Sequence, residues 1–223
     1  MSGVVDRLRA LLTGRETVPE GFAGTLDDGE RVVADGRGPR GSVVLATDLG
    51  LWLPPAASGE GARRISWHLV TKATWAGGAL EVIEAEEVDE LAGGVVLLAD
   101  RSPRRVPLTE PGRLPETVHR RVTAAVKDSQ HHDLGPGDGG GGAWFVQRRV
   151  PGAGIVLHVR PDPGTDPETV RTVAAGVGER LREAGRGAER SRTIETGRGA
   201  ERSRTIDTGR GAERGPAPDE ERG

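Results

Sequence analysis

The five histidines are the side chains in this sequence best suited to metal binding or proton transfer. They are His68, His119, His131, His132 and His158. A zinc site needs three or four converging ligands, but the side chains of the adjacent His131 and His132 point apart on a strand or a helix. The chain has no cysteine, which excludes thiolate catalysis, disulfides and cysteine–metal sites. We therefore expect no metal ion and no other cofactor.

Catalytic motifs are also missing from the sequence. It contains no Gly-x-Ser-x-Gly turn, no His-Glu-x-x-His pair and no Gly-Lys-Ser/Thr phosphate loop. An acidic run offers paired carboxylates that are able to bind cations or transfer protons, although a solvated strand edge and loop is the commoner origin of such a run. Its members are Glu81, Glu84, Glu86, Glu87, Asp89 and Glu90. The sequence therefore predicts a protein that is not an enzyme.

The four tryptophans are the most informative large side chains, since the chain has only two Phe and no Tyr. Trp52, Trp67, Trp75 and Trp144 all lie in strand-like segments. Buried, each indole would contribute about 2 kcal/mol or more to the core. Exposed, the indoles would form a platform for a ligand. The scarcity of other large residues favours the core, and the platform remains the alternative.

Short β-type segments separated by Gly, Pro and Asp clusters predict a meandering antiparallel sheet or small barrel. The expected strands are 30–35, 42–47, 50–53, 64–70, 73–76, 79–85, 94–99 and 105–108. A helix is expected from Leu114, where Val118, Val122 and Ala125 continue an apolar stripe. Laying this helix over an open end of the sheet would bury both apolar surfaces.

The chain divides by composition into five segments. They are an N-terminal helix and lead-in (1–23), the barrel with its helix (24–127), a Gly-rich linker (128–142), a hairpin plus helix (143–184) and a repeat tail (185–223). The hairpin and its helix are marginal alone, so we expect them to dock on the barrel. The tail repeats with a period of twelve and has one large apolar residue per full copy, so we expect it to be disordered.

Bulk properties set the class of protein. Hydrophobic residues make up 35% of the chain, charged residues 29%, and the net charge is only −3. Charges at Asp6, Arg7 and Arg9 interrupt the apolar stretch that an export signal would need. No run approaches the ~18 apolar residues of a membrane span. We therefore expect a cytoplasmic protein without a transmembrane segment.

Residues 24–127 resemble the pleckstrin-homology-like (PH-like) barrel as it occurs in small proteins of GC-rich bacteria. The resemblance lies in Val-Val-Leu-Ala-Thr-Asp-Leu-Gly-Leu-Trp-Leu (43–53), in Ile-Ser-Trp-His-Leu-Val (65–70), in Ala-Thr-Trp (73–75), in Gly-Ala-Leu-Glu-Val (78–82) and in the following helix. It implies an α+β fold, with a bent antiparallel barrel of about seven strands capped at one end by the helix. It also implies binding through the loops at the open end, and lipid-binding members carry a basic first hairpin there. The matching loop here carries Arg37 and Arg40 among glycines.

A binding fold without catalytic groups predicts a non-catalytic binding or scaffolding module, for which we expect a protein or peptide partner. The alternative is an anionic ligand, either a lipid headgroup or a nucleic acid. Arg37 and Arg40 are the candidate contacts for that ligand, together with the Arg-rich tail. Nine Arg in the tail meet eight Asp or Glu, which makes nucleic acid the less favoured partner. Homo-oligomerisation is left open.

Overall fold

The computed structural model describes residues 18–56, 60–135 and 141–206, with the side chains of 187–206 left out. The chain divides into two units, Met1–Gly178 and Glu179–Gly223, which are described separately. The helix expected near the N-terminus lies outside the described residues. The architecture is mixed α+β with a curled half-barrel of strands, as the sequence predicted in outline.

The first sheet has four strands in the order in which they occur in the sequence. They are β1 (Val32–Arg37), β2 (Val43–Thr47), β3 (Gly50–Leu53) and β4 (Arg63–Ser66). A 3-10 turn, η1 (Pro39–Gly41), connects β1 to β2, and a second, η2 (Trp67–Leu69), follows β4. The single strand expected over 64–70 is therefore broken by η2. All neighbours in this sheet are antiparallel, as a meander requires.

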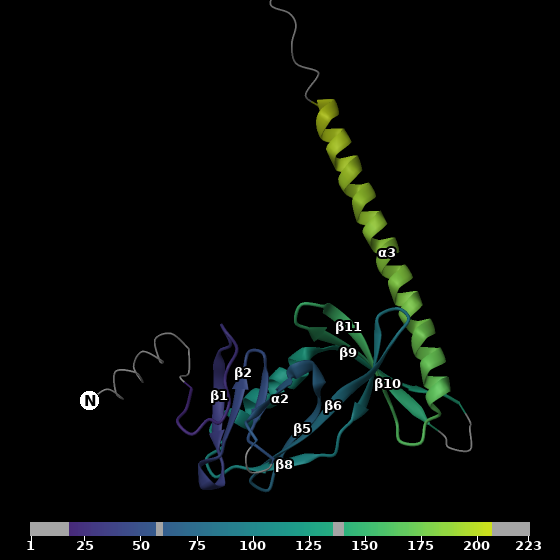
Figure 1. Cartoon of the computed structure of the whole chain (residues 1–223). Coiled ribbons are helices and arrows are strands. Elements are labelled where there is room, and N and C mark those ends of the chain that lie inside the picture. The colour runs from purple at the N-terminus through teal and green to yellow at the C-terminus, as the bar shows by residue number, and fades with distance from the viewer. Residues whose placement is uncertain (1–17, 57–59, 136–140, 207–223) are drawn as a thin grey trace, which may run out of the picture. The chain divides into compact units, whose positions relative to one another are not determined.

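The second sheet continues the meander, and the strands of the C-terminal hairpin then pair with it (Figure 1). Its strand order is β5-β6-β7-β11-β10-β9, and β8 pairs with β6 off this path. The strands are β5 (Val70–Ala76), β6 (Ala79–Leu91), β7 (Val95–Asp100), β8 (Arg104–Pro107), β9 (Val126–Asp133), β10 (Gly142–Val150) and β11 (Gly154–Pro161). The first half of β6 pairs with β5 and β8, and its second half pairs with β7. The hairpin joins through a parallel pairing of β11 with β7.

The segment 128–142, predicted as a linker, begins instead as a strand. Strand β9 runs to Asp133 and pairs antiparallel with β10 along its length. It is the last strand of the sheet, and nearly all its side chains are exposed. Because an exposed edge strand needs no apolar alternation, its polar composition resembled that of a linker.

Helix α2 (Leu114–Ala125) begins at the predicted residue and covers the half-barrel. Its stripe buries Leu114, Val118 and Ala125 in a core shared with strands of both sheets. At about 25 cal/mol per Å² of apolar surface, each of the larger side chains stabilises the fold by about 2 kcal/mol. The predicted helix and its apolar face are therefore confirmed.

Helix α3 (Pro167–Ile206) follows the hairpin, as the sequence predicted, and Asp166 is its N-cap. The Asp166 carboxylate accepts a hydrogen bond of 2.9 Å from the backbone N–H of Thr169. The first turns of α3 pack Val170 and Ala174 against the sheet, over a second core. The sheet contributes Val95, Leu97, Ala143, Phe145 and Val159 to that core.

The later turns of α3 run into the repeat tail, as far as Ile206. Residues 207–223 lie outside the described residues, so the predicted disorder of the tail stays a prediction. Among the described residues, no helix combines the length and the apolar character that crossing a membrane requires.

Changing Gly178 to alanine is expected to lower the free energy of unfolding by about 2 kcal/mol. An added Cβ would lie 2.4 Å from Cγ2 of Val95 and 2.9 Å from the carbonyl oxygen of Ala92. This overlap outweighs the ~1 kcal/mol by which alanine normally favours a helix over glycine. Urea unfolding measures the effect. Gly185→Ala is the control, because its Cβ would meet nothing within 4 Å and no loss is expected.

Candidate functional site

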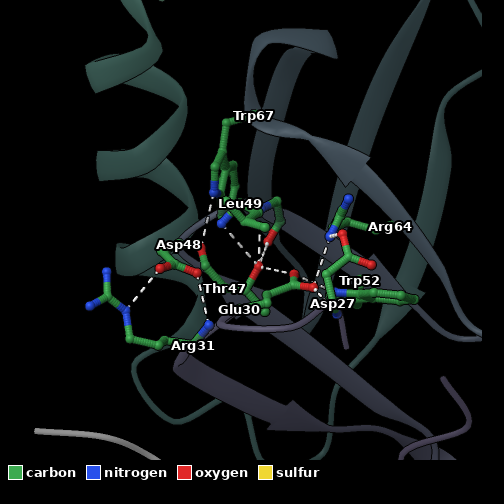
Figure 2. A network of polar contacts seen from close by, with 10 residues as sticks. Asp27, Glu30, Arg31, Thr47, Asp48, Leu49, Trp52, Arg64 and Trp67 are labelled. Atoms are coloured by element: carbon green, nitrogen blue, oxygen red, sulfur yellow. Dashed lines mark hydrogen bonds and ion pairs between the residues drawn. The ribbon is translucent and has the colours of Figure 1, made fainter. Parts of the chain in front are cut away.

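A polar network holds the four strands of the first sheet together (Figure 2). At its centre lies the buried carboxylate of Glu30, just before β1. It accepts hydrogen bonds from the Thr47 hydroxyl at 2.5 Å, the Trp52 indole at 2.8 Å and the Arg64 guanidinium at 2.8 Å. The Trp67 indole adds a bond of 3.0 Å to the Thr47 carbonyl. These groups satisfy one another, so the network is structural.

The Thr47 hydroxyl has a second task in the turn between β2 and β3. Its oxygen accepts hydrogen bonds from the backbone N–H groups of Leu49 and Gly50, at 3.2 and 3.0 Å. The turn contains Thr47 and Asp48, and the Thr47 hydroxyl supplies hydrogen bonds that backbone groups make in other turns. Gly50 is required there because a Cβ would lie 2.4 Å from the Ile65 carbonyl oxygen.

Changing Glu30 to glutamine is expected to lower the free energy of unfolding by about 2 kcal/mol at pH 7. Burial raises the pKa of Glu30, but the hydrogen bonds from Thr47 and Trp52 and the charge of Arg64 outweigh it, so the pKa is lowered. The ionised carboxylate therefore stabilises the fold above the pKa of an unfolded Glu, and this stability is lost as the pH falls.

The difference between wild type and Glu30→Gln should accordingly shrink in urea unfolding below about pH 4. Asp28→Asn is the matched control, because Asp28 is exposed in the same segment and should change the free energy of unfolding by less than about 0.5 kcal/mol. A pH-independent difference would contradict this assignment of the Glu30 charge.

The two arginines expected as ligand contacts lie at the turn after β1. Arg37 ends β1, and its guanidinium donates to the backbone carbonyl of Glu20 at 3.3 Å. Arg40 is exposed in η1, with a left-handed φ of 57°. Neither residue lines the cavity described below.

The acidic run lies along β6 and its carboxylates are divided among separate partners. Glu84 pairs with Arg63, and Glu86 pairs with Arg101 at 2.8 Å. Farther along, Asp89 approaches Arg171 of α3 at 3.4 Å. Across the part of the chain that the structure describes, no three His, Asp or Glu side chains gather where they could hold a metal ion.

A cavity of about 240 Å³ opens on the face of the second sheet opposite to the α3 core. The side chains of a strand alternate between its two faces. In β10, Phe145 therefore packs toward α3, whereas Trp144 and Val146 face the cavity. The apolar lining is Leu98, Val126, Trp144 and Val146. The polar lining is Thr71, Ser129, Arg148, His158 and Arg160.

Arg148 is the buried cation of this cavity, with only 5% of the residue exposed. Its Nη1 donates to the Val70 carbonyl at 2.9 Å, while its buried Nε–H has no partner. Burial and the charge of Arg160 lower the pKa of Arg148, against the attraction of Asp100. Asp100 is itself paired with Arg160 at 2.7 Å. A guanidinium stays protonated even so, and the charge of Arg148 is left without a carboxylate partner among the described residues.

His158 lies beside Arg148 and is almost completely buried, with 1% exposed. Neither of its ring nitrogens has a partner. Burial, with the nearby His68 and Arg148, lowers the pKa of His158 to about 4, so the ring is neutral at pH 7. The ring of His68 lies 5.9 Å away between centroids, and its Nδ1 is buried without a partner too.

These three residues share an uncommon property. Among the described residues, every buried side-chain nitrogen or oxygen without a hydrogen bond belongs to His68, Arg148 or His158. An unsatisfied buried polar group costs about 1–3 kcal/mol, and more when it is charged. Such groups are rare in folded proteins, and strain, a catalytic role or a bound water or ion accounts for them. The arrangement suits an anion better than acid–base catalysis, because His158 lacks a group to orient its ring.

No protein-family model, curated protein or solved structure matches the chain. The function is therefore inferred from the geometry of this cavity.

The sequence patterns did not predict a site at Arg148 or Arg160. His158 was considered only as one of five histidines. A signal was present in β10, where Trp144, Val146 and Arg148 occur at every second position on one strand face. An arginine continuing an apolar face indicates a buried cation. Opposite these residues on β11 lie Arg160 and His158, but this pairing needed the register of the hairpin.

The tryptophans divide between buried and more exposed positions. Trp52 and Trp67 are core residues, each 8% exposed. Trp144 is half-buried on the cavity wall, where its ring lies 5.0 Å from that of His131. Trp75 is 40% exposed on β5.

Proposed function

We propose that this chain is a non-catalytic binding module that holds a small anionic ligand in the cavity lined by β5, β7, β9, β10 and β11. One observation carries the proposal, namely the buried guanidinium of Arg148, whose Nε–H is unpaired. The side chain of Arg148 lines the cavity, so an anion there would compensate the charge of the guanidinium. Charge-assisted bonds of this kind contribute about 1.5–3 kcal/mol each. The anion class was the alternative considered from the sequence, but the site differs from the Arg37–Arg40 turn.

We also propose that the half-barrel is related to the PH-like barrel. The order of elements supports it: a four-stranded sheet β1–β4, the strands β5, β6 and β8, and then the covering helix α2. The second half of β6, with β7 and the hairpin, extends this arrangement. The ligand site of this chain would then belong to the extension, and not to the loops that the family generally uses.

A protein or peptide partner remains a second candidate because β9 ends the sheet. An edge strand presents backbone N–H and C=O groups to which an extended peptide is able to add. A pull-down with the full chain and with residues 1–184, washed at low and at high salt, tests this candidate. One protein retained by both chains at high salt would support it. Capture only by the full chain at low salt would assign binding to the tail.

The anion proposal is tested by isothermal titration calorimetry and thermal unfolding of the full chain with acetate, benzoate, sulfate and inorganic phosphate. At least one anion is expected to bind and to raise the Tm. Saturation at 100 times Kd stabilises by about 2.7 kcal/mol. Arg148→Met should abolish the effect, whereas the double variant Arg37→Met/Arg40→Met should keep it.

Two results would overturn the proposal. One is the absence of a Tm shift or binding heat with every anion, which would leave water as the occupant of the cavity. The other is binding that survives Arg148→Met but disappears in the Arg37→Met/Arg40→Met variant. That result would move the anion to the turn after β1.

A further inference from the structure

We infer that the ligand is an organic monoanion, a carboxylic acid with an apolar body of about one ring, and not a phosphate or a nucleotide. This inference rests on the anion-binding function proposed above and specifies the chemistry of the same site. It follows from the size of the cavity, the division of its walls and the number of uncompensated charges.

The cavity is small. Its volume of about 240 Å³ lies below the ~300–1,000 Å³ of pockets for drug-sized ligands. It exceeds the ~150 Å³ of an engineered apolar cavity that holds one benzene molecule. The space therefore fits one ring, or an aliphatic chain of similar volume, with a head group. A nucleotide, with its base, sugar and phosphate, is too large.

The walls divide the cavity into an apolar and a cationic part. Leu98, Val146 and the half-buried indole of Trp144 supply apolar and aromatic surface. Arg148 and His158 supply polar side chains. A bare inorganic anion would leave the apolar wall in contact with water, so a ligand with both characters fills the space better.

Of the charged side chains that line the cavity, one arginine has no ion pair among the described residues. Arg160 is already paired with Asp100 at 2.7 Å, and Asp100 also accepts a bond of 2.9 Å from the Thr71 hydroxyl. His158 faces His68 and Arg148, and neither of these favours its protonation. Arg148 is attracted by Asp100 but forms no ion pair among the described residues, so a single carboxylate would supply its partner. A phosphate dianion would carry an excess negative charge into a buried space.

A carboxylate also suits the placement of the polar side chains. Trp144, Val146 and Arg148 alternate along β10 and therefore share one face of the sheet, and His158 lies opposite Val146 on β11. All four residues line the cavity. The guanidinium of Arg148 would donate to the carboxylate, beside the apolar wall.

A panel of probes on the full-length protein tests the inference, with calorimetry as the main readout and indole fluorescence of Trp144 as the second. The probes are acetate, benzoate, cyclohexanecarboxylate, benzyl alcohol, inorganic phosphate and phenyl phosphate. Benzoate or cyclohexanecarboxylate is expected to bind at least about 10-fold more tightly than acetate, because of the apolar contact. Benzyl alcohol, which lacks the charge, should bind at least about 10-fold more weakly than benzoate.

Two variants separate the parts of the site. Trp144→Ala should reduce the preference for benzoate over acetate while leaving acetate binding within about twofold. Arg148→Met should remove binding of every carboxylate. The fluorescence change with benzoate should disappear in Trp144→Phe, while the calorimetric binding of benzoate remains.

The outcomes distinguish this inference from the proposed function. Phosphate or phenyl phosphate binding more tightly than benzoate, or equal affinity for acetate and benzoate, would overturn the inference. The anion-binding function would still stand if that binding depended on Arg148. No binding of any anion would overturn both.

Discussion

Replacing Arg148 by methionine is expected to abolish anion binding and, at the same time, to raise the free energy of unfolding of the ligand-free protein by about 1–2 kcal/mol. The buried guanidinium makes one hydrogen bond, of 2.9 Å, to the Val70 carbonyl and leaves its Nε–H unpaired. Replacing buried charges by apolar side chains of similar volume is often neutral or stabilising by about 1–4 kcal/mol. Binding sites often contain residues that lower the stability of the ligand-free protein. Arg148 fits this description, because a bound anion would pair with its charge.

Urea unfolding with and without benzoate measures both halves of this prediction. Arg149→Met is the matched control, because the neighbouring Arg149 is exposed and donates to the Ala124 carbonyl at 3.0 Å. It should change the free energy of unfolding by less than about 1 kcal/mol and leave binding intact. A large loss of stability in Arg148→Met would instead identify Arg148 as a structural link between β10 and the half-barrel.

The second large effect is expected with pH. As the pH falls from 7 toward 4, the buried His158 should lower the free energy of unfolding by about 3 kcal/mol. The unfolded chain binds a proton at His158 near pH 6.5, whereas burial, His68 and Arg148 hold the folded pKa at about 4. The unfolded state therefore binds more protons over this interval, so stability falls as the pH decreases. The lowered pKa of His68, also caused mainly by burial, acts in the same direction.

Urea unfolding at pH 7, 5.5 and 4.5 tests this effect. The variant His158→Leu, which has no titrating group at this position, should show a clearly flatter dependence. His119→Gln serves as the control because His119 is exposed on α2, and its pH dependence should equal that of the wild type. An unchanged slope in His158→Leu would show that His158 takes up its proton as easily in the folded protein as in the unfolded chain.

Local patterns in the sequence were enough to predict most of the half-barrel. The strand at 50–53 and the start of helix α2 at Leu114 match the structure, because alternation, turn residues and helical spacing are properties of neighbouring residues. Strand β9 was missed because a strand that pairs along one edge and faces solvent has no apolar pattern.

The cavity could not be derived in the same way, because its walls come from segments far apart in the sequence. Arg148 meets the Val70 carbonyl across 78 positions, and Arg160 meets Asp100 across 60. The parallel pairing of β11 with β7 brings these residues together, and no local signal specifies it. Arg37 and Arg40 were chosen because their loop matches the basic first hairpin of lipid-binding PH-like members, whereas the alternation of Trp144, Val146 and Arg148 along β10 was not used.

The pairing of β7 with β11 also affects how this chain is made on the ribosome. Leu97 is synthesised about 60 residues before its partner Val159. At about 5–20 residues per second, that interval lasts about 3–12 s. Throughout it, one edge of β7 is unpaired, and Val95 and Leu97 lack the strands and helix that later cover them. An unpaired strand edge is a template for pairing with another chain, so nascent chains are most prone to associate with one another during this interval.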